Sequence, residues 1–264
     1  MPKPAPRPYT VLNRQLVTPH MLRLTFGGEG MAGFPADQES AYIKLAIPTV
    51  HESMPETPSS VMRTYTVRHQ RDGEIDVDIV LHEDGGPAAT WAAAAAPGDT
   101  ILIGGPGPAK RLPENADWYL LVGDMTSLPA IGANLERLPS NAQGRAIIEV
   151  TSEADIQELD LPDGVQIDWL INPHPGSDSD RLVDALREFD WRPGTSGIWV
   201  ACEFSAMRKL RRHLIDERGV GKREMYISSY WKLGTSEDGH RVVKREDVMA
   251  NTDYVGDGYG LPTA

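Results

Sequence analysis

The alternation of hydrophobic and polar positions divides the chain into two parts. In the first part, short apolar stretches rich in β-branched residues are separated by turns rich in Gly and Pro, which predicts β-strands with hardly any helix. The predicted strands are residues 10–12, 21–26, 42–48, 61–68, 75–82 and 99–104. We expect Pro48 to end the third strand, and residues 49–60 to form a mobile loop. Six such strands predict a small antiparallel barrel.

The second part alternates strands with helices. Strands are predicted at 118–123, 144–151, 165–170 and 197–201, and their nearly continuous apolar character is typical of a parallel sheet buried on both faces. Helices are predicted at 124–138, 180–189, 205–218 and 239–249. We therefore expect a six-stranded antiparallel β-barrel domain over residues 1–112 and a doubly wound parallel-sheet domain over residues 113–264. The helix at 239–249 should pack on the second domain, and the last ten residues should be mobile.

Composition narrows the class of protein. The chain has 264 residues, 40% of them hydrophobic and 24% charged, which is typical of a soluble globular protein. The longest apolar run, Ala92 to Ala96, is too short to cross a bilayer, and we expect no secretory signal at the start. A single cysteine, Cys202, excludes an internal disulfide and a Cys-only metal site. These features predict a cytoplasmic protein.

The net charge of −12 argues against non-specific binding to nucleic acid or to anionic membranes. A local cluster of Lys and Arg could still bind an anionic ligand against this overall charge. The histidines are scattered along the chain, and no His, Asp or Glu group has the spacing of metal ligands. We therefore expect no metal held by the protein itself.

The strand at residues 61–68 carries a chemically useful pattern. Alternation places Arg63, Tyr65 and Val67 on one face, and Thr64, Thr66 and Arg68 on the other. A guanidinium beside an aromatic ring suits a phosphate and a flat ring system. The same segment would also suit an edge strand with a solvated polar face.

Three further segments suit ligand binding: one is a possible anion site, and two should lie at one edge of the parallel sheet. Gly85 to Ala92 reads as a glycine turn, a proline at the first helical position and an alanine-rich helix, whose free amides would attract an anion. An ordinary loop–helix junction would have the same sequence. Gly123 to Ala130 and Ala201 to Phe204 follow apolar strands, so both should lie at the carboxyl edge of the parallel sheet, where ligands bind. The Gly-x-Gly-x-x-Gly fingerprint of dehydrogenases is not found in the sequence.

Arg-x-Tyr-Thr-x-Arg, at residues 63–68, resembles the flavin-binding strand of the ferredoxin reductase-like superfamily. With its second arginine it is similar to the siderophore-interacting protein family, flavoenzymes that reduce ferric siderophores. Three more blocks resemble that family in the same order: His82 to Ala92, Gly123 to Ala130, and Tyr230 to Gly234. In the last block Lys232 replaces the family's usual arginine, which keeps the charge but loses the bidentate geometry. The resemblance covers roughly residues 8 to 250.

The resemblance implies FAD as cofactor and NADH or NADPH as electron donor. The residues implied for FAD are Arg63, Thr64, Tyr65, Thr66, His82, Gly86, Pro87, Ala88, Thr90, Trp91 and Trp231. Those implied for the nicotinamide nucleotide are Asp124, Thr126, Pro129, Glu203 and Ser205. Tyr65 and Thr66 would be catalytic, with Thr66 donating a hydrogen bond near the flavin N5. Cys202 stands where the family more usually has glycine, which bears on how closely the nicotinamide approaches.

The implied substrate is a ferric siderophore, and the implied reaction is its reduction by a monomeric enzyme. An anionic siderophore is expected in a basic pocket formed by Lys44, Arg68, Arg111 and Lys232. Each of these cations taken alone would also suit a solvated surface position. Two other functions stay open: a siderophore carrier without redox chemistry, and a flavin reductase that serves another electron-transfer protein.

Overall fold

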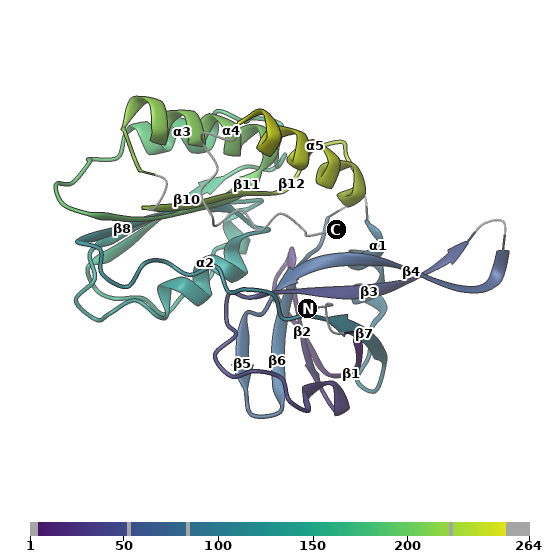
Figure 1. The fold of residues 1–264 in the computed structure, drawn as a ribbon. Coiled ribbons are helices and arrows are strands. Elements are labelled where there is room, and N and C mark those ends of the chain that lie inside the picture. Colours follow the sequence, from purple (N-terminus) through teal and green to yellow (C-terminus); the bar gives the residue numbers. More distant parts are fainter. Residues whose placement is uncertain (1–4, 52–53, 83–84, 222–223, 252–264) are drawn as a thin grey trace. The chain divides into compact units, whose positions relative to one another are not determined.

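The computed structural model describes residues 5–51, 54–82, 85–221 and 224–251. The chain divides into two compact units, Met1–Lys110 and Arg111–Ala264 (Figure 1). No helix in these described ranges is both long enough and apolar enough to span a membrane.

The first unit is built on one antiparallel sheet. Its strands are β1 (Arg7–Thr18), β2 (Met21–Gly27), β3 (Tyr42–His51), β4 (Met54–Thr66), β5 (His69–Arg71), β6 (Glu74–Val80) and β7 (Thr100–Gly104). They follow the order β4-β3-β7-β1-β2-β6-β5, and the unit also contains the short helices η1 (Glu29–Met31) and α1 (Pro87–Ala94). This barrel-like sheet confirms the predicted fold class. The predicted count of six strands omitted β5, which pairs with β6 across a turn that Gly73 allows with its φ of 74°.

The predicted loop at residues 49–60 is wrong, because the described part of this segment is paired strand. The ladder between β3 and β4 continues past Pro48, which lies opposite Ser60, to His51 opposite Met54. Figure 1 shows this two-stranded ribbon running out from the rest of the sheet. Proline is tolerated there because β4 is an edge strand, and β3 pairs with β7 only over Lys44–Ala46.

The second unit is a five-stranded parallel sheet with helices on both faces. Its elements are β8 (Trp118–Asp124), α2 (Leu128–Leu135), β9 (Gly144–Val150), η2 (Glu153–Asp155), β10 (Val165–Ile171), α3 (Arg181–Arg187), β11 (Ser196–Glu203), α4 (Phe204–Arg212), η3 (His213–Glu217), β12 (Met225–Trp231) and α5 (Glu237–Ala250). The order β10-β9-β8-β11-β12 confirms the doubly wound prediction. The helices α3 and α4 lie on one face of the sheet and α2 on the other (Figure 1). The strand order reverses between β8 and β11, and this is where such folds bind ligands.

Three of the differences between this unit and the sequence prediction are larger than one or two residues or concern a whole element. Strand β12 was not predicted, because its buried centre contains Ser228 and Ser229 rather than an apolar run. Helix α2 ends at Leu135 instead of Leu138, shortly before Pro139, which disfavours helix in the residue before it. The helix predicted at 205–218 is α-helical only to Arg212 and continues as a π-helical turn.

Helix α5 packs on the second unit, as predicted. Arg211 donates two hydrogen bonds, of 2.6 and 2.9 Å, to the carboxylate of Asp247, and both residues are buried. His240 Nε2 lies 2.9 Å from Ser229 Oγ of β12. Burial, together with nearby Lys244 and Lys232, lowers the pKa of His240 to about 4, so this histidine is neutral at physiological pH. The last ten residues, predicted to be mobile, lie outside the described residues.

Candidate functional site

The start of α1 has the features of an anion site in the first unit. Gly86 is the N-cap residue and Pro87 the first helical residue, and within the described chain no side chain caps the free amides. No acidic residue lies in the first turn. Among the described residues of α1 and its cap, nothing compensates the positive end of the helix dipole, which suits a diphosphate.

The residues around this helix start belong to the set predicted for FAD. The Thr90 hydroxyl donates to Gly85 O at 3.0 Å and so fixes the turn before the helix. The Trp91 ring is stacked on Phe26, with an interplanar angle of 10°, which ties the helix to the apolar core of the sheet. His82 is exposed, and its ring lies beside Gly86, 3.6 Å from where a Cβ would stand.

Strand β4 places its predicted residues on two faces. Arg63 lies opposite Leu45, and Tyr65 lies opposite Ile43, so both share the face of the apolar core. Tyr65 packs against that core, and Arg63 is half-buried. Thr64, on the other face, is exposed, and Thr66 is buried with 8% of its surface accessible. The strand therefore presents a cation and an aromatic ring together, as the alternation predicted.

The second unit has a similar uncapped helix start at α2. Ser127 is its N-cap residue, but the Ser127 hydroxyl donates to Asp124 O at 2.9 Å, and the described residues supply no side-chain cap to the helix. Gly123 makes this turn possible, because a Cβ there would stand 2.1 Å from Ser127 Oγ. Pro129 lies in the first turn, and the turn contains no acidic residue. This is the predicted nucleotide loop, and it fits a diphosphate.

Asp124 is the centre of a buried hydrogen-bond network at the switch point. Its Oδ1 accepts from the Thr126 amide at 2.9 Å and from the Thr126 hydroxyl at 2.6 Å. Its Oδ2 accepts from the Glu203 amide at 2.9 Å and from the Trp231 indole at 2.8 Å. The structure thus brings four of the predicted site residues together, with Asp124 as the acceptor that joins them. Burial raises the pKa of Asp124, while these four donors oppose the rise.

Glu203 is the N-cap residue of α4, the third helix at this site. Its Oε2 accepts the Ser205 amide at 2.5 Å and the Ala206 amide at 3.2 Å, so it caps α4. Its Oε1 accepts the Leu233 amide at 3.2 Å. Two amides of the first turn of α4 are therefore occupied by a carboxylate and are not free for an anionic ligand. The neighbouring Cys202 is fully buried, and burial raises the pKa of its thiol well above the usual value.

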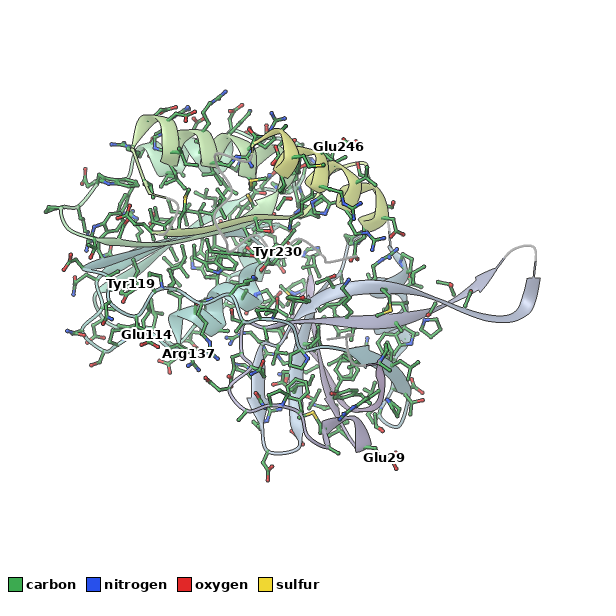
Figure 2. The ribbon with its side chains drawn as sticks, viewed as in Figure 1. Glu29, Glu114, Tyr119, Arg137, Tyr230 and Glu246 are labelled. Atoms are coloured by element: carbon green, nitrogen blue, oxygen red, sulfur yellow. The ribbon has the colours of Figure 1, made fainter. Side chains whose placement is uncertain are left out.

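The segment after β10 lies against the same residues. Gly176 has a φ of 78°, and a Cβ there would stand 2.8 Å from Trp231 Cη2 and 3.4 Å from Glu203 Cγ. Glycine is thus required for both its backbone conformation and its small size. Next to Trp231 in β12 is Tyr230, which Figure 2 labels. Its ring packs edge-on against that of Trp199, with the ring centroids 6.1 Å apart.

The sequence prediction missed Glu149, a buried carboxylate beside Asp124. Glu149, in β9, lies opposite Asp124 in the sheet register, with 6% of its surface accessible. Burial and the nearby Asp124 raise the pKa of Glu149 to about 7, although Asn172 and Arg181 oppose this rise. The signal in the sequence was a carboxylate that ends the apolar run of the second parallel strand.

The four cations predicted for substrate binding have different surroundings. Lys44, in the first unit, lies opposite Thr64 on the face away from Arg63 and Tyr65. Arg68 has only 4% of its surface accessible, which disfavours contact with a siderophore. Arg111 and Lys232 belong to the second unit and are half-buried, and Lys232 Nζ lies 4.8 Å from the centre of the Phe204 ring.

The fold and these sites together define the class of protein. The structure matches ferredoxin–NADP+ reductase of Plasmodium falciparum with a TM-score of 0.64, over 85% of this chain and 96% of that chain. The sequences are 15% identical, so this match shows the fold alone. The chain therefore has the fold of ferredoxin–NADP+ reductase.

The chain belongs to the siderophore-interacting protein family. A model of the siderophore-interacting FAD-binding domain matches residues 10–60 and 48–110, and a model of siderophore-interacting proteins matches residues 116–234. The structure of SipS from Aeromonas hydrophila is 32% identical, with a TM-score of 0.82 over 94% of this chain and all 100% of that chain. Ferric vibriobactin reductase ViuB of Vibrio cholerae is 31% identical, over 89% of this chain and 92% of its own length. These matches confirm the family and an FAD-binding first domain.

Proposed function

We propose that this protein is a ferric-siderophore reductase that takes electrons from NADH or NADPH through FAD. The observation that carries the proposal is the pair of uncapped helix starts, one in each unit, at α1 and α2. One diphosphate site serves FAD, and a second serves a nicotinamide nucleotide. A siderophore carrier without redox chemistry would have no use for the second site.

The residues of the first unit fit FAD. The free amides at the start of α1 would hold its diphosphate, and the Arg63 guanidinium would balance part of that charge. Tyr65 and Trp91 offer aromatic surface, and Thr66 offers a hydroxyl with little access to water. When bound, FAD supplies the conversion of a two-electron hydride into single electrons.

The residues of the second unit fit a nicotinamide nucleotide. The start of α2 would hold the diphosphate, while Asp124 keeps Thr126, Glu203 and Trp231 in fixed positions around it. In the balanced reaction, one NAD(P)H reduces two ferric chelates to the ferrous state and releases one proton. The weaker binding of Fe(II) by the siderophore then frees the metal.

The substrate is proposed to be an anionic ferric siderophore, and the candidate cations for contacting it are Lys44 in the first unit and, separately, Arg111 and Lys232 in the second. Arg68 is a weaker member of this set because the fold encloses it. The alternative of a flavin reductase that docks an electron-transfer protein on α4 is disfavoured by ion pairs. Arg208 and Arg211 pair with Asp247, and Lys209 pairs with Asp180 at 2.6 Å, so these cations are compensated within their own unit.

The decisive experiment is anaerobic reduction of the purified protein, followed by addition of a ferric siderophore. We expect a visible flavin spectrum that NADH or NADPH bleaches, and that a ferric siderophore restores with release of chelatable Fe(II). Bound flavin that neither nucleotide bleaches, together with siderophore binding, would indicate a carrier. Bleaching without recovery on addition of any ferric siderophore would indicate a flavin reductase.

A further inference from the structure

The carboxyl ends of β9 and β10 lie where the adenosine half of a dinucleotide belongs. In a doubly wound sheet, the dinucleotide spans the point where the strand order reverses, with its diphosphate at the first helix start. Here that start is α2, and the reversal lies between β8 and β11. With the nicotinamide directed toward β11, the adenosine must extend over β9 and β10. This inference rests on the proposed function, because it concerns the same nucleotide site.

The chain between these two strand ends is strongly acidic. Residues 146–180 contain nine Asp and Glu and no Lys or Arg. Glu149 lies near the end of β9, and exposed Glu153 begins η2 directly beyond it. Asp178 and Asp180 follow β10 and are exposed.

The cations that approach this acidic stretch are already paired. Arg181, at the start of α3, donates to Ile171 O and lies 3.9 Å from the carboxylate of Asp178. Lys209, from α4, forms an ion pair of 2.6 Å with Asp180. These two cations therefore reduce the negative charge of the edge without reversing it.

A second observation at this edge points to a ligand with hydroxyl groups. The Nδ2 of Asn172 is buried and has no hydrogen-bond partner among the described residues, and 3% of the Asn172 surface is accessible. Asn172 lies close enough to Glu149 to lower the pKa of that carboxyl. An amide donor beside a carboxylate acceptor is the combination that a ribose hydroxyl requires, since a hydroxyl both donates and accepts.

We propose that this acidic edge selects NADH and rejects NADPH. NADPH differs from NADH by a 2′-phosphate, which adds roughly −1.5 to −2 charges at neutral pH. Placed over β9, that phosphate would meet Glu149 and Glu153, and residues 146–180 contain no lysine or arginine. The cation near Glu149 is Arg181, and it already has Asp178 as an acidic neighbour. The ribose 2′-hydroxyl of NADH carries no charge and can donate to a carboxylate.

The test is a binding measurement that does not depend on catalysis. The full-length flavin-loaded protein is titrated calorimetrically with 5′-AMP and with adenosine 2′,5′-bisphosphate at low ionic strength. We expect 5′-AMP to bind at least about tenfold more tightly than the bisphosphate. Glu153→Arg should raise bisphosphate affinity about tenfold and change 5′-AMP affinity much less. Asp163→Arg is the matched control, because it makes the same charge change at an exposed residue. Asp163 lies just before β10, at the amino ends of the strands and away from the proposed site.

Each outcome decides the inference. Preference for 5′-AMP, with rescue of bisphosphate binding by Glu153→Arg but not by Asp163→Arg, supports it. Equal or tighter binding of the bisphosphate to the unmodified protein overturns the NADH preference but leaves the proposed reductase intact. If neither nucleotide binds and neither NADH nor NADPH reduces the flavin, both the inference and the proposed nucleotide site fail.

Discussion

The carboxylate of Asp124 accepts the indole N–H of Trp231 at 2.8 Å, across 107 residues of sequence. The same carboxylate receives Thr126 and the amide of Glu203, so one buried side chain links the ends of β8, β11 and β12. These are the segments in which the sequence motifs of the second unit lie. The relative positions of the proposed nucleotide contacts therefore depend on one acceptor.

Asp124→Asn should disturb the whole network. Asparagine keeps the size of the side chain, but it replaces one acceptor oxygen with an N–H₂ donor. That donor would face other donors, either those of Thr126 or those of Glu203 and Trp231. We expect a loss of about 2–3 kcal/mol in the free energy of unfolding and roughly tenfold weaker nucleotide binding. Denaturant unfolding, tryptophan fluorescence and calorimetry measure these effects. Asp168→Asn, which removes a partly exposed partner of Arg145, is the control.

Arg63→Ala should yield largely flavin-free protein. The variant removes the cation that β4 presents beside Tyr65, while Arg63→Lys keeps a charge without the planar geometry and should retain part of the flavin. The ratio of visible to ultraviolet absorbance of the purified variants measures the occupancy. Full flavin content in Arg63→Ala would remove Arg63 from the proposed site.

Thr66→Val should keep the flavin but slow its reduction. The Thr66 hydroxyl is buried, so a hydrogen bond that it makes to the flavin would face little competition from water. We expect roughly tenfold slower reduction by NAD(P)H in stopped-flow experiments. Thr100→Val, at an exposed residue of β7 outside the predicted site, should reduce at the normal rate. Identical kinetics in the two variants would show that Thr66 has no special part in the reaction.

Reduction of an anionic ferric siderophore should weaken as salt rises, because salt screens the attraction that Lys44 and Lys232, one cation in each unit, are proposed to exert on it. The double variant Lys44→Ala with Lys232→Ala should raise the apparent Michaelis constant severalfold and leave flavin content unchanged. The control Arg187→Ala with Lys209→Ala also removes two charges, each paired with an aspartate of its own unit. A Lys44/Lys232 variant with unchanged kinetics at low ionic strength would contradict this role for the two lysines.

Glu149→Gln should stabilise the protein in mildly alkaline solution. The folded-state pKa of Glu149 is about 7, above the ordinary value of 4.5, so the folded state binds this proton more tightly than the unfolded state. The free energy of unfolding therefore falls as pH rises from the unfolded pKa through the folded one. The variant should be more stable than the parent at pH 8, by roughly 1–3 kcal/mol, and show no advantage near pH 4. Thermal unfolding across this pH range measures the difference, and a pH-independent difference would contradict it.

The fold was predictable from the sequence where the pattern of apolar residues along a segment matches the pattern of its buried positions. The parallel strands β8 and β11 are buried along their whole length, and their continuous apolar runs identified them. The ribbon of β3 and β4 was missed because its prolines suggested a loop, and strand pairing at a sheet edge tolerates them. Strand β12 was missed because Ser228 and Ser229 are buried with polar partners from α5.

The candidate site was predictable as a set of residues but not as a network. Family motifs indicated Asp124, Glu203 and Trp231. Nothing in these motifs predicted that the Asp124 carboxylate would accept hydrogen bonds from the other two residues. Such contacts arise only when strands distant in sequence become neighbours in the sheet. Asn172 had no motif around it, and only the three-dimensional structure shows that its Nδ2 has no hydrogen-bond partner among the described residues.

The buried pair of Arg211 and Asp247 sets a practical limit on shortened versions of this protein. The match to the family model ends at residue 234, which would make that position a natural place to end a recombinant fragment. A fragment ending there would lack the whole of α5 and with it Asp247, the carboxylate that pairs with Arg211 in the full chain. Removing one partner of a buried pair costs about 3–5 kcal/mol, a large part of the stability of an ordinary domain. The smallest fragment that folds as this domain does should therefore extend through Ala250.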